Sequence, residues 1–345
     1  MAYSSIGNPR FYINDSHFMI ANGAGNVQPV NAEPGSSHDE WDNGVAMLNV
    51  GKDYKTTAYG DGAYQNQERI DFPVSGNYNF CFILGHNMAA VNSSYFLWDT
   101  GASEPIDATS GVNFSPAGYN GWTLHIFDGD DEQEPNEGKA LFHTAGGSAT
   151  GITKIKSVCI GKYYDMPHSP DLNLTMTREY GGIKNTETKS GASLSNDFGS
   201  SPPKWGNLAA WELIGATAPT NQELSRSGRR VWDLSFSYLD SGDVFGSNQL
   251  ISRSRQDLTD GVDDADTGGF LNSGNFEYNI LSDDNFYSQV IHKTNGGQLP
   301  FIFQPDSSNS NIDSFAICKF DQKSFSFQQT APGLYSVKMK IREVW

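Results

Sequence analysis

Residues Gly228 to Leu239 read Gly-Arg-Arg-Val-Trp-Asp-Leu-Ser-Phe-Ser-Tyr-Leu, and they carry the clearest periodic pattern in the chain. Large apolar side chains recur at every second position with polar residues between them: Trp232, Leu234, Phe236 and Tyr238 alternate with Asp233, Ser235 and Ser237. A period of two places the two sets on opposite faces of an extended backbone. The pattern therefore predicts a half-buried β-strand anchored by aromatic side chains.

A second alternating stretch closes the sequence: Tyr335, Val337, Met339 and Ile341 alternate with Ser336, Lys338, Lys340 and Arg342. A strand needs neighbours in a sheet, and the apolar face of that sheet needs a cover. We therefore expect packed β-layers. We also expect five aromatic residues in the core: Trp232, Phe236, Tyr238, Phe301 and Tyr335.

The composition indicates an all-β fold. The chain of 345 residues is long enough for two or three domains. Aromatic residues make up 12% of it, which is too much buriable surface for a disordered protein. The 36 glycines and 15 prolines separate short apolar runs, as expected for strands joined by turns.

The charge and the apolar runs exclude several classes of protein. A formal net charge of −17 opposes binding to nucleic acids and to anionic membrane surfaces. The start of the chain has neither the basic region nor the apolar run of a signal peptide, and no apolar run is long enough to span a bilayer. We expect a soluble protein, made in the cytoplasm, with no nucleic-acid binding and no membrane insertion.

The three cysteines, Cys81, Cys159 and Cys318, lie far apart in the sequence. The chain contains no Cys-x-x-Cys pair, which excludes zinc-ribbon and redox motifs of that type. We expect buried or incidental thiols in a protein assembled in a reducing compartment.

Short apolar runs joined by Gly and Asn turns predict a β-sandwich over residues 1–157. The run Asn79–Leu84 is almost wholly apolar, which is typical of a strand covered on both faces. The other predicted strands of this part are Val45–Val50, Tyr95–Trp98, Trp122–Phe127, Ala140–Phe142 and Ile155–Ile160.

Residues 158–345 are predicted to form a second β domain, whose first strand contains the alternating Leu172, Leu174 and Met176. A helix is expected to begin at Ser282-Asp283-Asp284 and to end at Gly296-Gly297. Four apolar residues lie at helical spacing between these signals: Phe286, Tyr287, Val290 and Ile291. Short strands are expected at Pro300–Phe303 and Phe315–Phe320.

Asp-Thr-Gly occurs twice, at Asp99-Thr100-Gly101 and at Asp266-Thr267-Gly268. Pepsin-like proteases use two such triplets so that two carboxylates share a proton. The second triplet lies in an acidic stretch rather than after an apolar strand, however. A motif of this kind has meaning only in its structural context, and we favour ordinary turns at both places.

Other polar clusters give no specific signal. His38–Glu40 and Asp128–Glu137 offer oxygen ligands for calcium, but neither has the spacing of a known loop, and a solvated acidic loop is favoured. Gly85-His86-Asn87 fits a ligand cleft or a turn, and we favour the turn. Nucleophile-elbow, P-loop, His-Glu-x-x-His and EF-hand patterns do not occur in the sequence. We therefore predict no catalytic, cofactor-binding or metal-binding residues, and no enzyme.

In their order along the chain, several segments resemble siphophage tail-tip proteins of the distal-tail or minor-tail type. Phe82–Asn87 is similar to the strand-end signature of β-sandwich domains in phage tail and virion proteins. Arg229–Phe236 resembles the central strand of the tail-tip proteins. Further similarity lies in Gly161–Pro170, in Leu299–Phe303 after the predicted helix, and in the closing strand Tyr335–Val344.

The resemblance implies a structural virion protein that forms a homo-oligomeric ring at the tail tip or baseplate of a phage, with no active site and no cofactor. The implied fold is an N-terminal β-sandwich of jelly-roll or galactose-binding-like type, followed by a tube-type β-barrel with one packed helix. The implied partners are tail-tube, hub, baseplate or fibre subunits. The implied location is the virion, after synthesis in the host cytoplasm.

A carbohydrate-binding module for host glycans is the alternative. Sugars stack on exposed aromatic rings and form hydrogen bonds with amides and carboxylates. The candidate rings are Trp41, Tyr54, Tyr59, Tyr64 and Trp122. Exposed rings beside a cleft would favour this alternative, and rings buried in a core or in subunit contacts would favour the structural protein.

Overall fold

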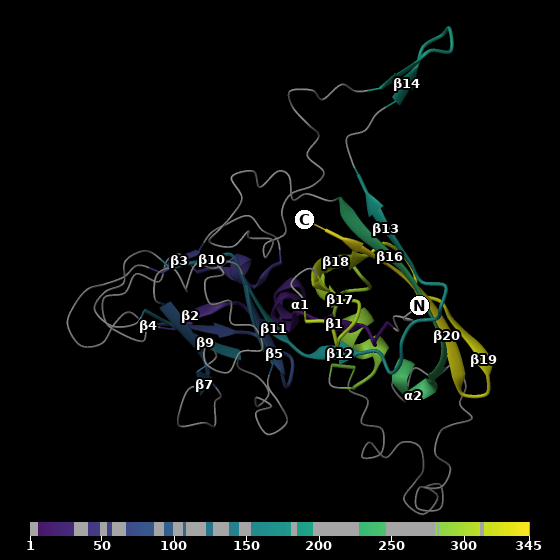
Figure 1. The fold of residues 1–345 in the computed structure, drawn as a ribbon. Coiled ribbons are helices and arrows are strands. Elements are labelled where there is room, and N and C mark those ends of the chain that lie inside the picture. Colours follow the sequence, from purple (N-terminus) through teal and green to yellow (C-terminus); the bar gives the residue numbers. More distant parts are fainter. Residues whose placement is uncertain are drawn as a thin grey trace, which may run out of the picture.

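β-Strands dominate the fold (Figure 1), so the predicted all-β class is confirmed. The structure is a computed structural model that describes residues 6–30, 41–48, 54–56, 67–85, 93–98, 106–107, 122–126, 138–144, 153–180, 185–195, 228–245, 280–281, 283–310 and 314–344.

The largest described sheet is eight-stranded and antiparallel. In spatial order its strands are β12 (Tyr163–Asp165), β1 (Arg10–Tyr12), β17 (Phe301–Gln304), β18 (Ala316–Phe320), β20 (Leu334–Glu343), β16 (Arg229–Asp240) and β13 (Thr175–Glu179), with β19 (Phe327–Ala331) paired to β20. The two periodic stretches of the sequence are β16 and β20, and they pair with each other. The short strands predicted near Phe301 and Phe315 are β17 and β18.

One face of this sheet is apolar, and the sheet curls around it. Trp232 and Leu234 on β16 lie opposite Ile341 and Met339 on β20, and all four are buried. The rings of Trp232 and Phe303 are 5.3 Å apart although two strands separate β16 from β17. In a flat sheet three strand spacings amount to about 14 Å. The sheet is therefore strongly curved, with the aromatic residues on its concave side.

The predicted helix fills part of that concave side. The helix η8 (Tyr287–His292) has π-helical rather than α-helical hydrogen bonds, and the Asn285 side chain accepts a bond from the Ser288 backbone N–H at 2.9 Å. Phe286 packs against Phe11 of β1, with ring centroids 5.8 Å apart. Gly297, at the predicted end of the helix, has a φ of 88° and lies under Phe320.

A second group of sheets comes from the first half of the chain. A three-stranded sheet has the order β11 (Ser157–Gly161), β5 (Phe80–Leu84) and β8 (Trp122–Ile126). A five-stranded sheet has the order β2 (Gln28–Val30), β4 (Gln67–Phe72), β9 (Gly138–Thr144), β6 (Ser93–Trp98) and β7 (Ile106–Asp107). In the same half, β3 (Tyr54–Thr56) pairs with β10 (Thr153–Ile155). In the second half of the chain, β14 (Asn185–Glu187) and β15 (Ser193–Ser195) form a separate hairpin.

β5 is covered on both faces, as its sequence predicts. Phe80 and Phe82 join the core of the eight-stranded sheet, where each ring lies about 5 Å from the ring of Tyr12 (5.1 and 5.0 Å). Cys81 and Ile83 point the other way, into a second core that includes Ile70 and Phe72 of β4 and Trp41. The strand therefore lies between two apolar layers, which explains its unbroken apolar run.

In the first part of the chain, two predicted strands differ from the observed elements. The prediction of a strand at Val45–Val50 is wrong, because residues Asn43–Ala46 form a 3-10 helix, η1. The Asp42 side chain accepts a hydrogen bond from the Gly44 backbone N–H at 2.8 Å and so starts this turn. The predicted strand Ile155–Ile160 is divided between β10 and β11. The other helices within the described ranges are α1 (Asp15–Ala21) and the single turn α2 (Ser241–Val244).

Four of the five predicted core aromatic residues are buried, and Tyr238 is not. Trp232, Phe236, Phe301 and Tyr335 are each at most 3% exposed, whereas Tyr238 is 74% exposed. The register of β16 against β20 shifts between Phe236 and Leu239, and Tyr238 has a φ of 64°. This bulge interrupts the period of two and turns the ring outwards.

The predicted division at residue 157 stays a prediction, and one strand lies across it. β1 comes from the first part of the chain but pairs between β12 and β17 of the second part. At the crossing, Gly161 approaches the backbone so closely that a Cβ there would lie 2.1 Å from the Ile13 carbonyl oxygen. The two parts are therefore joined by backbone contact as well as by a shared core.

The interface between α1 and η8 contains a buried ion pair. Lys293 Nζ lies 3.2 Å from Asp15 Oδ1, and both side chains are at most 4% exposed. The Ser75 backbone N–H and hydroxyl also donate to Asp15. Burial together with the charge of Lys319 lowers the pKa of His17, and burial together with the charge of Lys293 lowers the pKa of His292. This interface therefore disfavours additional positive charge.

We predict that Phe236→Ala lowers the free energy of unfolding by about 3–5 kcal/mol, because it empties a fully buried site. Tyr238→Gly, two residues away, is expected to change it by less than about 1 kcal/mol, since glycine adopts a positive φ without strain. Urea unfolding of both variants measures the difference. Equal losses would show that the outward position of Tyr238 is wrong.

We predict that acidification destabilises the α1–η8 interface. The pKa values of His17 and His292 are lower in the folded protein than in the unfolded chain, so the unfolded chain binds more protons. This stability contribution is complete above the ordinary histidine pKa of about 6.5 and is lost as the pH falls below it. Urea unfolding at a series of pH values should show the loss, and His17→Asn should reduce its size. A pH dependence that His17→Asn and His292→Asn both leave unchanged would contradict the prediction.

Candidate functional site

Most of the polar motifs singled out in the sequence lie outside the described residues. This applies to both Asp-Thr-Gly triplets, to His38–Glu40, to Asp128–Glu137 and to His86-Asn87. Within the ranges that the structure describes, no three His, Cys, Asp or Glu side chains are grouped so that they could hold a metal ion. In the same ranges, no helix combines the length and the hydropathy needed to cross a membrane.

The three cysteines are free and fully buried, as predicted. Burial raises the pKa of each thiol, and the nearby Glu343 adds to this effect at Cys318. Because the thiolate is the reactive form, none of these residues is suited to nucleophilic or redox chemistry.

One of the five aromatic rings that could stack on a sugar is buried. Trp41 is only 6% exposed and packs in the second core with Val45 and Ile70. The side chains of Tyr54 and Trp122, and the whole of Tyr59 and Tyr64, lie outside the described part of the chain.

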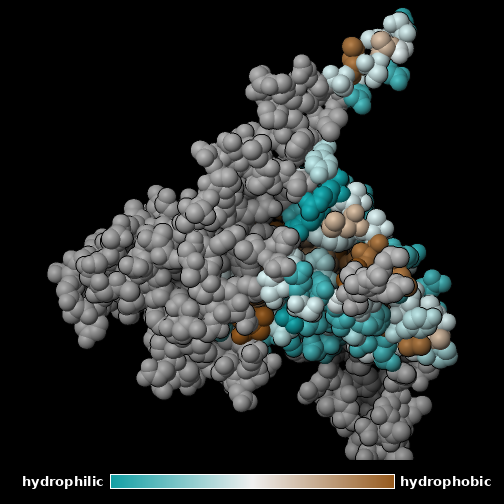
Figure 2. Space-filling view, viewed as in Figure 1, coloured by the Kyte–Doolittle hydropathy of each residue, from teal (hydrophilic) through white to brown (hydrophobic). Residues whose placement is uncertain are grey.

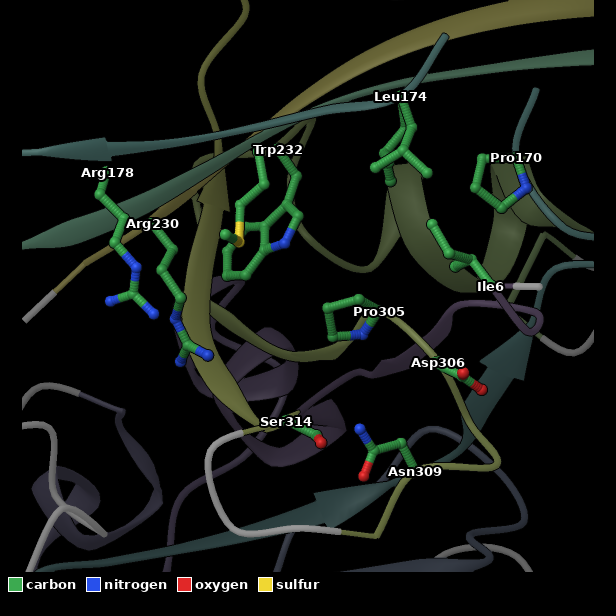
Figure 3. A pocket seen from close by; sticks show the side chains of 12 residues that line it. Ile6, Pro170, Leu174, Arg178, Arg230, Trp232, Pro305, Asp306, Asn309 and Ser314 are labelled. Carbon is green, nitrogen blue, oxygen red and sulfur yellow. The ribbon is translucent and has the colours of Figure 1, made fainter. Parts of the chain in front are cut away.

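Among the described residues, a pocket of about 440 Å³ lies on the concave side of the eight-stranded sheet (Figure 3). We call it the seam pocket, because β13 at one end of the curved sheet forms one wall, and the segments beside β1, β12 and β17 at the other end form the opposite wall. Its lining is mainly apolar: Ile6, Pro170, Leu174, Met176, Trp232, Leu234 and Pro305, with Arg178, Arg230, Asp306, Asn309 and Ser314.

The charged wall of the pocket is fixed by a buried ion pair. Arg230 donates from Nη2 to Glu343 Oε1 at 3.0 Å and from Nε to Oε2 at 3.2 Å. It also donates to the Phe315 carbonyl at 2.9 Å, and its guanidinium lies 5.2 Å from the Trp232 ring centroid. The Glu343 side chain is only 2% exposed. Arg230 is therefore a structural support for Trp232, and Figure 3 shows it beside Arg178 at one end of the pocket.

The opposite wall is a turn that begins at Asp306. The Asp306 carboxylate accepts hydrogen bonds from the Ser308 hydroxyl at 2.6 Å and from the Ser308 backbone N–H at 3.0 Å. Burial raises the pKa of Asp306, but these bonds and one from the Gly7 backbone outweigh it, so that the pKa is lowered. The turn holds Pro305 and Asn309 against the pocket, and Asp306 remains ionised at neutral pH.

Asp171 fixes the third side of the pocket. It accepts hydrogen bonds from the hydroxyls of Ser235 and Ser237 on β16, both at 3.0 Å. These bonds tie the segment before β13 to the polar face of β16. The strand itself begins only at Thr175, so the predicted strand through Leu172 and Leu174 starts later than expected, and Leu172 is fully exposed.

Most of the exposed large apolar side chains in the described ranges lie between residues 172 and 195. Among the described residues, six large apolar or aromatic side chains are exposed, and four of them lie between residues 172 and 195: Leu172 (103%), Met176 (50%), Tyr180 (45%) and Leu194 (58%). The hairpin formed by β14 and β15 stands away from the body of the molecule (Figure 1), and apolar atoms are visible on it (Figure 2).

The site lacks the parts of a catalytic centre, as far as the described residues define it. Its two arginines and one aspartate are not joined by a histidine or a cysteine, and no nucleophile in its lining lies beside a general base. The Ser314 hydroxyl is buried without a hydrogen-bond partner in the described structure. An apolar pocket beside an edge strand is suited to receive a segment of protein.

We predict that Glu343→Gln lowers the free energy of unfolding by on the order of 3 kcal/mol, because it removes the negative charge that lies against the buried guanidinium of Arg230. Glu179→Gln is the matched control. Glu179 pairs with Arg342 at 2.6 Å, but both side chains are about two-fifths exposed (41% and 38%), and we expect a loss below about 1 kcal/mol. Urea unfolding compares the two variants, and equal losses would contradict the buried role of Glu343.

Comparisons with known proteins identify no relative of this chain. No protein-family model, no curated protein and no solved structure matches the chain.

Proposed function

We propose that the protein is a structural subunit of a tailed-phage virion, which assembles as a homo-oligomeric ring at the tail tip or baseplate. Its proposed neighbours are tail-tube, hub, baseplate or fibre subunits, and its place is the virion after synthesis in the host cytoplasm. The observation that carries the proposal is the position of four of the six exposed large apolar side chains in the described part of the chain: Leu172, Met176 and Tyr180 lie on or beside the edge strand β13, and Leu194 lies on the projecting hairpin.

Such a surface is typical of proteins that bind other protein subunits. Exposed apolar groups that cluster beside an unpaired strand edge mark protein–protein contacts, because they are stabilised only when a partner removes them from water. Among the described strands, β13 pairs with β16 on one edge and with no strand on the other. The edge strand and the apolar groups occur together, so the same contact can cover both.

The observed sheets also support the two domain types that we propose for this protein. The curved eight-stranded sheet with η8 on its concave side is what a tube-type β-barrel with one packed helix requires. The stacked sheets around β5 are what an N-terminal β-sandwich of jelly-roll or galactose-binding-like type requires. Both assignments are part of the proposal.

Light scattering on the purified chain over a concentration series tests the function. We expect the mass of a closed ring, such as a trimer or a hexamer, which stops growing once the ring is complete. A monomer at every concentration, together with specific binding in a glycan screen, would contradict the proposal and establish the carbohydrate-binding alternative instead.

A further inference from the structure

The hairpin of β14 and β15 has little to stabilise it within its own chain. Each strand has three residues, and all six strand residues are exposed. An isolated two-stranded hairpin is marginally stable in water, because it buries almost no apolar surface. Leu194 in the middle of β15 nevertheless presents a large apolar side chain to solvent. The hairpin therefore has the properties of an arm that is completed by another surface.

The seam pocket offers what the hairpin lacks: an exposed apolar side chain next to an open strand edge. Met176 lies on the pocket face of β13, opposite Trp232 of β16, and is half exposed. A strand added to the outer edge of β13 would place a side chain beside Met176 on the same face, about 5 Å away. Leu194 is flanked by Ser193 and Ser195, so β15 presents one apolar side chain on one face and two small polar ones on the other.

We propose that β15 of one copy of the chain adds to the edge of β13 in a second copy and places Leu194 against Met176 in the seam pocket. This inference rests on the proposed assembly function and names the surfaces that perform it. The contact is heterologous, since arm and pocket are different surfaces, and repetition of such a contact generates a ring when the rotation closes.

The charges favour a second copy as the occupant. The chain has a net charge of −17, so two copies repel each other over most of their surface. The charged residues that line the pocket are two arginines and one aspartate, Arg178, Arg230 and Asp306. The described arm carries one acidic and one basic residue, Glu187 and Lys189. Arm and pocket are therefore not acidic in an acidic chain, so this contact avoids the repulsion between acidic surfaces.

Two variants test the contact from its two sides. Leu194→Asp removes the arm's apolar group, and Met176→Asp places a charge in the pocket. We expect each variant to be monomeric by light scattering. Tyr238→Asp is the matched control, because it makes the same change at an exposed aromatic residue outside the pocket lining. It should assemble like the unaltered protein. Circular dichroism and urea unfolding verify that each variant is folded.

Mixing the two variants gives the distinguishing result. A Leu194→Asp subunit keeps an intact pocket, and a Met176→Asp subunit keeps an intact arm, so the mixture should form one-to-one dimers although neither variant associates alone. A Leu194→Cys variant mixed with a Met176→Cys variant should likewise give a disulfide-linked dimer under mild oxidation, because the three native cysteines are buried. This second measurement does not depend on the aspartate variants.

The outcomes separate the inference from the proposed function. If the unaltered chain and the Leu194→Asp variant form a ring equally well, the proposed contact between arm and pocket is wrong. The proposal of a ring is then still supported. If Met176→Asp is monomeric but the mixture gives no dimers and no cross-link, β13 is joined by a surface other than the arm, and the inference is overturned. If the unaltered chain never associates, both the ring and the contact are wrong.

Discussion

The packing of the whole structure depends on the short strand β1, because its neighbouring side chains Phe11 and Tyr12 point into two different layers. Phe11 faces the concave core, where its ring lies 5.2–5.8 Å from those of Phe303, Phe301 and Phe286. Tyr12 faces the other way and packs against β5, while its hydroxyl donates to Gln304 Oε1 at 3.0 Å. Both residues are at most 1% exposed. One short strand thus joins the sandwich-like layers to the curved sheet.

The curvature that follows from this aromatic packing creates the candidate site. A flat sheet would expose the rings of Trp232 and Phe303, whereas the curled sheet brings them into contact and brings its two ends near each other. The sheet does not close, so β13 keeps one edge without a strand among the described residues and the seam pocket stays open beside it. The proposed assembly follows from this geometry, since a neighbouring subunit would supply the strand that the described sheet lacks.

The sequence predicts the long strands well because their patterns have a local cause. β16 and β20 alternate over many residues, and the apolar run of β5 follows from burial on both faces. The position of Tyr238 could not be predicted, because a bulge depends on the register of the partner strand. The three-residue β1 is too short to show a period. The seam pocket is formed by segments that lie far apart in the sequence and meet only in the folded structure: Ile6, residues 170–178, residues 230–234, residues 305–309 and Ser314.

In the proposed assembly, another protein segment covers the open edge of β13. Backbone amide hydrogen exchange of residues Thr175–Glu179, measured at low and at high protein concentration, tests it most directly. We expect these amides to exchange more slowly at high concentration, while those of the central strand β18 are equally protected at both concentrations. Exchange of the β13 amides that does not change with concentration, in a sample whose mass does increase, would contradict it.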